Sequence, residues 1–298
     1  MNGVDKRSWT TLSAGADDEC MSDSRAPLRW LITGGSSGFG RTITEAVLAR
    51  GDAAVVTARD PGTLDDLAAR GAETAALDVT LADQVRSVVE SAAARGPIDV
   101  LVNNAGFGHV GALEEVAEAD LRRVLEANVF GALAMTRAVL PHMRAARSGH
   151  IVQMSSVGGV IGNPGHAAYA TSKFALEGAS EALAGEVAPF GIRVTIVEPG
   201  PFRTRFAGGS MTWADPIADY ADTPAGALRD RFAQQDGVQP GDPVRAAEII
   251  VDTVHSGDAP LRLPLGRAAV ERIRERLTTR LAELEEVAKL GLSADFAG

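Results

Sequence analysis

Residues Thr33 to Gly40 read TGGSSGFG. An apolar run ends at the first of them, and the residues that follow, RTITEAVLAR, repeat their apolar side chains with the period of a helix. Glycines let a backbone turn tightly and approach a ligand, and a helix N-terminus presents unpaired N–H groups to a phosphate. A strand, a glycine loop and a helix in this order predict a nucleotide-binding unit, although a glycine-rich turn without a ligand would look the same.

Short apolar runs and amphipathic helical patterns alternate along the rest of the chain. This alternation is typical of a parallel sheet with crossover helices on both faces. We expect strands at 28–33, 53–58, 73–77, 98–102, 149–154, 192–198 and, more weakly, 260–264. We expect helices at 38–50, 60–70, 81–94, 118–146, 168–189 and 243–256. The predicted fold class is therefore α/β, with a doubly wound parallel sheet in a single domain over residues 28–266.

Three regions depart from this alternation. Residues 1–27 show neither period and are predicted to form a disordered tail. Residues 200–240, called the lid segment below, combine Gly, Pro and Asp with scattered aromatic residues, and a long irregular connection in a compact domain is usually functional. Residues 267–298 are expected to form an amphipathic helix and tail, because 267–290 carries apolar residues at helical spacing. That helix lies either on its own domain or against another subunit.

The composition limits the class of partner. The chain has 298 residues, a formal net charge of -10 and 45% hydrophobic residues, which is ordinary for a soluble globular protein. Nucleic acids and anionic membranes attract basic surfaces, so we expect a small-molecule partner instead. We find no apolar run near the roughly 20 residues that span a bilayer, and no signal sequence. The single cysteine, Cys20, cannot form an internal disulfide, so we expect a cytoplasmic protein, whose natural start is Met1 or Met21.

Polar residues follow the next predicted strands. The position about twenty residues past a glycine loop contacts the adenosine ribose, where an acid would bind both hydroxyls and repel a 2′-phosphate. Ala58 and Arg59 stand there instead. A guanidinium suits a phosphate, which favours NADP over NAD, unless Arg59 is a solvated surface residue. Asp78 and the run NNAG at Asn103–Gly106 end the third and fourth strands, at the edge where doubly wound sheets bind ligands.

Together, these motifs resemble those of the short-chain dehydrogenase/reductase family. The glycine loop, NNAG, Ser156, YATSK at Tyr169–Lys173 and PG at Pro199–Gly200 occur in the family's order and at its usual separations, over about residues 28–265. The resemblance implies a seven-stranded Rossmann-type sheet and a homodimer or homotetramer formed through the helices at 118–146 and 168–189. It also implies a catalytic tetrad, which falls on Asn128, Ser156, Tyr169 and Lys173.

The same resemblance places the cofactor contacts. Thr204, in PGPFRT, matches the position that holds the nicotinamide carboxamide. With NADP as the expected cofactor and NAD as the less favoured one, the predicted binding residues are Gly34, Ser36, Ser37, Gly38, Phe39, Gly40, Arg59, Asp78, Val79, Asn104, Ala105, Gly106, Tyr169, Lys173, Pro199, Gly200 and Thr204.

A phenol beside an ammonium suits the chemistry of hydride transfer. A carbonyl that receives a hydride becomes an alkoxide, so its oxygen needs an acid. An unperturbed phenol, with a pKa of about 10, is too weak a base for the reverse reaction at neutral pH. Tyr169 and Lys173 share a helix face, so we expect the ammonium and the positive ring of the oxidised cofactor to lower the pKa of the phenol. Without the other motifs, an exposed helix pair would be the better interpretation.

The remaining polar candidates have supporting roles. Ser156, at the end of the fifth strand, is expected to hydrogen-bond the substrate oxygen. By the resemblance, Asn128 would use its amide and local backbone to hold a water that connects Lys173 to solvent. His109 and His166 are expected to be wall or surface residues, because the five histidines lack metal-ligand spacing, and we predict no metal site.

The motifs predict an NADP-dependent oxidoreductase that acts on a carbonyl or a secondary alcohol. Two alternatives stay open. A cofactor-binding regulatory protein would typically lack the Tyr or the Lys, and an epimerase or dehydratase on the same scaffold would need a larger substrate domain.

Aromatic residues gather where the substrate would bind, although they make up only 5% of the chain. Phe107 follows NNAG, and the lid segment holds the aromatic residues Phe202, Phe206, Trp213 and Tyr220. Met211 lies among them. Either these side chains line an apolar pocket for a bulky hydrophobic substrate, or they form a small satellite core that holds the lid segment down.

Overall fold

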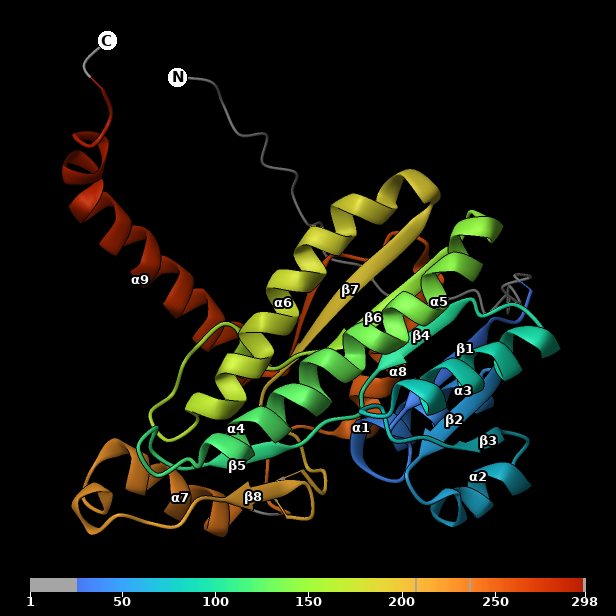
Figure 1. Ribbon diagram of the computed structural model, residues 1–298, viewed down its shortest axis with the longest axis horizontal. Coiled ribbons are helices and arrows are strands. Elements are labelled where there is room, and N and C mark those ends of the chain that lie inside the picture. Colours follow the sequence, from blue (N-terminus) through green and yellow to red (C-terminus); the bar gives the residue numbers. More distant parts are fainter. Residues whose placement is uncertain (1–25, 207, 236, 297–298) are drawn as a thin grey trace, which may run out of the picture.

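The computed structural model describes residues 26–206, 208–235 and 237–296 (Figure 1). The tail predicted at residues 1–27 therefore lies outside the described residues, except for its last two. The rest of the chain forms one α/β domain with a long C-terminal helix (Figure 1).

Seven parallel strands form the main sheet, in the order β3-β2-β1-β4-β6-β7-β9. Their bounds are β1 Arg29–Thr33, β2 Ala53–Ala58, β3 Glu73–Ala76, β4 Val100–Asn103, β6 Gly149–Met154, β7 Ile192–Pro199 and β9 Arg262–Leu265. All seven predicted strands are present, the weakly predicted last one included, and the doubly wound fold is confirmed. Because the chain moves outward from β1 to β3 and then returns to β4, the strand order reverses between β1 and β4, and a crevice opens at their carboxyl ends.

Two hydrophobic layers cover the sheet. On one face, Trp30 and Ile32 pack with α1 (Gly38–Ala49) and α8 (Pro243–Ser256). On the other face, Leu31 packs with α3 (Ala82–Arg95), α5 (Ala132–Ala146) and α6 (Ala167–Val187), which lie side by side in Figure 1. Alternate residues of one strand thus enter opposite layers, as a buried parallel sheet requires.

The helix predicted at 118–146 consists of three parts. A π-helical segment, Glu126–Gly131, separates α4 (Glu118–Leu125) from α5. By length and composition this run is the one helix of the described chain that could cross a membrane, but its α5 part packs Met135, Val139 and Met143 into the core of the sheet. The run is therefore a core helix. The helix predicted at 60–70 is also shorter, with a 3₁₀ turn at Pro61–Leu64 before α2 (Asp65–Ala69).

The lid segment is more regular than its composition predicts. It contains β8 (Met211–Trp213) and α7 (Pro224–Gln235), and β8 pairs in parallel with β5 (Gly108–Val110) to form a second, two-stranded sheet. A three-residue strand is too short to show alternation in sequence, and its partner lies about a hundred residues away. The interpretation of 200–240 as irregular chain was therefore wrong for both elements.

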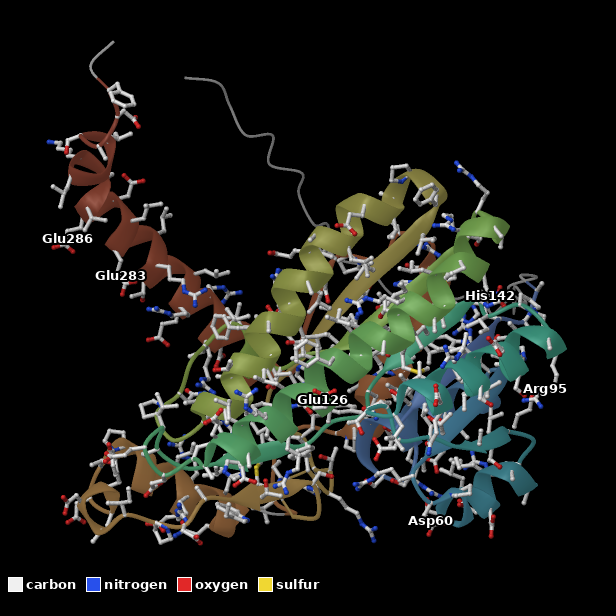
Figure 2. All side chains as sticks on the ribbon, in the orientation of Figure 1. Asp60, Arg95, Glu126, His142, Glu283 and Glu286 are labelled. Atoms are coloured by element: carbon white, nitrogen blue, oxygen red, sulfur yellow. The ribbon has the colours of Figure 1, made fainter. Side chains whose placement is uncertain are left out.

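The predicted C-terminal amphipathic helix is α9 (Arg267–Leu292). Its first two turns pack on the domain, since Ala269 and Ile273 join Val157 and Val160 in a small buried cluster. Farther along, Arg280 still donates to the carbonyl oxygen of Val160 at 2.9 Å and lies over the ring of Phe174, although Leu277 is already 54% exposed. The end of α9 projects away from the domain (Figure 1). Glu283 and Glu286 are labelled on this projecting part in Figure 2. The expectation of packing on its own domain is therefore met only by the first part of the helix.

Candidate active site

The glycine loop lies at the switch point and opens α1 toward the crevice. Ser37 precedes the helix in extended conformation and makes no capping hydrogen bond with its side chain, so the first N–H groups of α1 have no side-chain partner there. Gly40 packs tightly under the loop, because an added Cβ would lie 2.3 Å from the carbonyl oxygen of Gly34. A loop of this shape, followed by an uncapped helix of 12 residues, fits the pyrophosphate of a dinucleotide.

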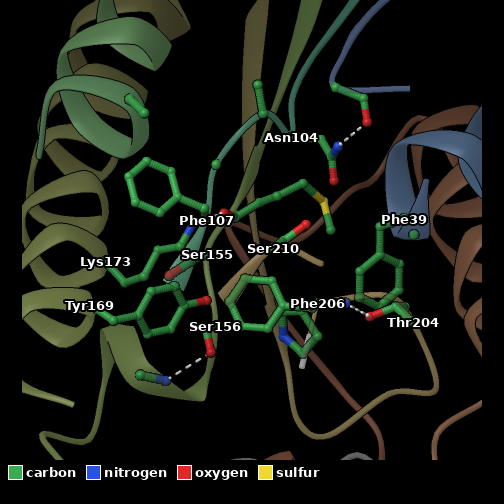
Figure 3. Close-up of a pocket in the computed structure, with 18 of the residues that line it drawn as sticks. Phe39, Asn104, Phe107, Ser155, Ser156, Tyr169, Lys173, Thr204, Phe206 and Ser210 are labelled. Carbon is green, nitrogen blue, oxygen red and sulfur yellow. Dashed lines mark hydrogen bonds between the residues drawn. The ribbon is translucent and has the colours of Figure 1, made fainter. Parts of the chain in front are cut away.

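Asn104 connects the end of β4 to this loop. Its side-chain amide donates to the carbonyl oxygens of Thr33 at 2.9 Å and of Gly34 at 3.0 Å, and its backbone N–H donates to Thr33 Oγ1 at 3.0 Å (Figure 3). The two strand ends on either side of the switch point therefore hold each other in place.

Arg59 and Asp78, at the ends of β2 and β3, line a cavity that also includes the glycine loop. Asp78 Oδ1 accepts hydrogen bonds from the Thr80 backbone at 3.0 Å and from its hydroxyl at 2.7 Å. Burial acts to raise the pKa of Asp78, but these two hydrogen bonds, with the nearby charge of Arg59, hold the pKa below its usual range. Arg59 is exposed and has no ion pair among the described residues, so its guanidinium is available to an anion.

Tyr169 and Lys173 lie on the buried face of α6, and each is 6% exposed. The ammonium of Lys173 donates to the carbonyl oxygen of Met154, at the end of β6, at 2.7 Å and lies 5.7 Å from the centroid of the Tyr169 ring. Ser156 lies beside the phenol and acts to lower its pKa, and the three side chains lie close together in Figure 3. The interpretation as an exposed helix pair is therefore excluded.

Burial sets the protonation of both groups. It raises the pKa of Tyr169 to about 12, against the opposing hydrogen bond from Ser156. It also lowers the pKa of Lys173 to about 8, against the opposing charge of Glu177. Only Ser156 opposes the rise in the pKa of the phenol, so the lowering expected from Lys173 is not found, and the part expected from the oxidised cofactor stays a prediction. At neutral pH the phenol is protonated, which suits a group that gives a proton.

Asn128 lies in the π-helical segment and is 1% exposed. Its side-chain oxygen accepts from the Phe107 backbone N–H at 3.0 Å, and its amide donates to the Phe107 carbonyl at 2.9 Å and to Ser172 Oγ at 3.0 Å. The side chain therefore joins the loop after NNAG to α6. Since its amide is used in these contacts, the water expected at Asn128 would have to bind the backbone.

One cavity of about 960 Å³ brings the predicted site residues together. It reaches from the glycine loop past Tyr169 to the lid segment and α9. All of the predicted catalytic and cofactor residues line it except Gly40 and Asn128, which support its wall from behind. A volume of this size accommodates a ligand of drug-like dimensions or larger.

The structure separates the lid aromatics into two groups. Phe206 lines the cavity with its ring centroid 5.5 Å from that of Tyr169, and Phe202 lines it 5.2 Å from Phe39. Met211 is buried in a satellite core with Val110 and Leu228. Trp213 and Tyr220 do not line the cavity. Phe202 and Phe206 thus line the cavity and Met211 belongs to the satellite core, while the class of substrate stays a prediction.

Several cavity residues were missed by sequence reasoning. Ser155 lies beside Ser156 and donates to the buried carboxylate of Glu177 at 2.5 Å, while Asn163, Arg231 and Arg272 form part of the wall near the lid. No spacing in the sequence relates these residues, because α7 and α9 reach the cavity only through tertiary packing. His166 is a wall residue as expected, whereas His109 lies behind the wall, with Nδ1 2.8 Å from Thr212 Oγ1.

Comparisons with known proteins agree with this geometry. The family model for short chain dehydrogenases matches residues 29–215. A short-chain dehydrogenase structure from Streptomyces avermitilis has a TM-score of 0.86 at 46% identity, covering 91% of this chain and 100% of that one. A short chain dehydrogenase/reductase from Burkholderia phymatum, solved in complex with NAD, has a TM-score of 0.72 at 25% identity, covering 83% and 92%.

Two relatives add to the comparison. Oxidoreductase BOA17 of Botryotinia fuckeliana is 40% identical over 270 residues, which are 89% of this chain and 98% of that protein. Retinol dehydrogenase 8 of Homo sapiens is 38% identical over 257 residues, which are 80% and 81% of the two chains. This chain therefore belongs to the short-chain dehydrogenase family and is an NAD(P)-dependent oxidoreductase.

Proposed function

We propose that this protein is an NADP-dependent oxidoreductase that interconverts a bulky apolar carbonyl compound and the corresponding secondary alcohol. The observation that carries the proposal is the place of the Tyr169 phenol, which lies beside Ser156 in a cavity where Phe206 packs against its ring. A proton donor thus lies between a nucleotide-binding crevice and an apolar wall.

The side chains divide the work of the reaction. When bound, the nicotinamide supplies the hydride in one direction and accepts it in the other. Tyr169 gives its proton to the carbonyl oxygen as negative charge develops there, and takes a proton from the alcohol in the reverse direction. Ser156 donates a hydrogen bond to the same oxygen and orients it. Lys173 keeps a positive charge beside the phenol and helps to hold the cofactor ribose.

Apolar side chains support the substrate class. Phe107, Phe206, Leu228 and Phe232 line the part of the cavity beyond Tyr169. Retinol dehydrogenase 8, the human relative, is named for an alcohol with a long apolar body. The test measures kcat/KM for a panel of matched hydrophobic and polar carbonyl compounds, with the loss of reduced-nicotinamide absorbance as the readout. A higher kcat/KM for small polar carbonyls than for bulky apolar ones would contradict the proposal.

Arg59 supports NADP as the preferred cofactor, because it is a free guanidinium at the position where an acid would select NAD. A phosphate–guanidinium contact contributes about 1.5–3 kcal/mol, so Arg59→Ala should raise the KM for NADPH about ten- to hundredfold and leave the KM for NADH nearly unchanged. Arg70→Ala, at an exposed arginine paired with Glu45 outside the cavity, is the matched control. Equal effects of Arg59→Ala on both cofactors would contradict this cofactor preference. A parent enzyme that prefers NADH would also contradict it, and the Burkholderia protein was solved in complex with NAD.

We also propose a homodimer or homotetramer. Phe130, before α5, is 56% exposed, and Phe174 on α6 is 36% exposed, which supports contacts through the helices named by the family resemblance. A monomeric mass in solution scattering would contradict an oligomer.

A further inference from the structure

Three elements that hold no predicted cofactor residue line one end of the cavity: the loop before α6, helix α7 of the lid segment, and α9. The loop before α6 contributes Asn163 and His166, α7 contributes Arg231 and Phe232, and α9 contributes Arg272. This set is called the substrate end below. It combines an apolar ring with two guanidinium groups, although the protein as a whole is acidic.

His166 is a buried polar side chain with one open hydrogen-bonding position. It is 7% exposed, its ring centroid lies 5.2 Å from that of Tyr169 and 5.1 Å from that of Phe232, and its Nε2 has no hydrogen-bond partner within the described structure. Burial, with the charges of Arg231 and Arg272, lowers the pKa of His166 to about 4. The imidazole is therefore neutral at physiological pH, and it adds no positive charge of its own to the substrate end.

The two arginines leave positive charge at the substrate end. Arg272 is half-buried, and its guanidinium donates to Asn163 Oδ1 at 2.7 Å, which is an uncharged partner. Neither Arg272 nor Arg231 forms an ion pair with any described residue. By contrast, Arg29 is paired with Glu73 at 2.8 Å and Arg262 with Glu177 at 2.6 Å. Arg231 and Arg272 both line the cavity, and both lie near enough to His166 for their charges to lower the pKa of its imidazole.

We propose that the natural substrate carries a carboxylate or phosphate group in addition to its reacting carbon and its apolar body, and that Arg272 and Arg231 bind this group. The inference rests on the proposed function and narrows its substrate class from apolar compounds to anionic amphiphiles. Leu228, Phe206 and Phe232 contact the apolar body, and the guanidiniums, which can bind oxyanions through paired N–H groups, receive its charged end.

The test compares three ketones with one apolar chain: an oxo fatty acid, its methyl ester, and the phosphate monoester of the matching keto alcohol. We expect the parent to show a kcat/KM about ten- to hundredfold higher for an anionic ketone than for the ester, the range that a charge-assisted hydrogen bond confers. The anionic ketone with the higher kcat/KM shows whether the charged group of the natural substrate is a carboxylate or a phosphate. Arg272→Gln and Arg231→Gln should each remove most of this preference, because they should lower the kcat/KM of the anionic ketone far more than that of the ester.

Arg274→Gln is the matched control, because Arg274 is an exposed residue of α9 that does not line the cavity. A parent that reduces the ester as well as both anions would overturn the inference, as would arginine variants that slow ester and acid equally. If no ketone is reduced, the proposed function fails, and the inference is then decided by calorimetric binding of the oxo fatty acid. Weaker binding by Arg272→Gln than by Arg274→Gln supports the charged subsite, and equal binding overturns it.

Discussion

The cavity has two halves that are held in place in different ways. The strand-end half is lined by residues at or after the ends of the strands and on α6, and the lid half by residues of the lid segment, 200–240. In the strand-end half, Asn104, Asn128 and Lys173 are fixed by hydrogen bonds to backbone atoms of other elements, at 2.7–3.0 Å, and Asn128 and Lys173 are buried. In the lid half, backbone pairing with β5 holds β8, whereas α7 meets the domain through the small core of Val110, Met211 and Leu228 and through ring contacts such as Phe232 to His166.

This difference separates reaction from specificity. Backbone hydrogen bonds from sheet edges allow only one arrangement, which suits groups that must meet a reacting atom within a fraction of an ångström. Aromatic and aliphatic contacts tolerate changes of shape, so a lid built from them can adapt to different substrates on the same scaffold. Substitutions in the first half should therefore change the rate for all substrates, and substitutions in the second should change which substrate is preferred.

The largest effect is expected at the phenol. Tyr169→Phe removes the proton donor and keeps the ring, so kcat should fall by about 10²–10⁴-fold, while NADPH affinity stays within a few-fold. Steady-state rates and NADPH fluorescence titration measure the two quantities. Lys173→Ala should damage both, since its ammonium serves the phenol and the cofactor.

The chain provides its own control for this substitution. It contains two tyrosines, and the hydroxyl of the other one, Tyr220, donates to Glu114 on the exposed surface at 2.7 Å. Tyr220→Phe should leave kcat unchanged. Substantial turnover by Tyr169→Phe would refute the assignment of the proton donor.

A smaller effect, confined to selectivity, is expected in the lid. Phe206→Ala removes a ring that lines the cavity, and an aromatic contact contributes about 0.5–1.5 kcal/mol beyond its buried area. The preference for a bulky over a small apolar ketone should therefore fall about tenfold. Trp213→Ala removes a larger ring of the same segment that does not line the cavity, and it should leave this preference unchanged. Equal loss of selectivity in both variants would mean that the lid acts through its packing alone.

The sequence predicts the residues of the strand-end half because a short stretch of sequence is enough to place each of them at the end of a strand or on a helix face. Gly34, Asn104, Ser156 and Tyr169 each stand at or near the end of a strand or on one helix face, and the alternation of strands and helices brings strand ends to one edge whatever the rest of the chain does. All seven strands follow from short runs of apolar residues for the same reason.

The parts that could not be predicted depend on contacts between distant segments. β8 exists because it pairs with β5 about a hundred residues earlier, and Arg272 reaches the cavity because Ala269 and Ile273 anchor the start of α9. The π-helical turn at Asn128 has no signal in a helical period, since its flanks continue as ordinary helix. Likewise, burial of the Tyr169 phenol, which raises its pKa, is a property of the assembled cavity and not of the spacing to Lys173.

The smallest effect concerns the pH dependence of the strand-end half. Glu177 follows Lys173 by one helical turn and is 4% exposed, with its carboxylate between Ser155 Oγ at 2.5 Å and Arg262 Nη1 at 2.6 Å. A buried negative charge favours the ammonium, so it raises the pKa of Lys173, which burial has lowered to about 8. Glu177→Gln removes that charge and keeps an acceptor for Ser155. The pKa of Lys173 should therefore fall further.

Reduction needs Lys173 protonated, so kcat/KM of the parent should decline as pH rises through about 8. In Glu177→Gln this decline should begin at a pH lower by about one unit, with little change of rate on the acidic side. Glu181 contacts the same guanidinium, from Arg262 Nη2 at 2.7 Å, but its side chain is 53% exposed, so solvent screens its charge. Glu181→Gln should then leave the profile in place, although both variants remove one carboxylate from Arg262. Equal displacement in the two variants would place the cause in Arg262 and its packing, and an unmoved profile in both would show that Glu177 does not act on Lys173.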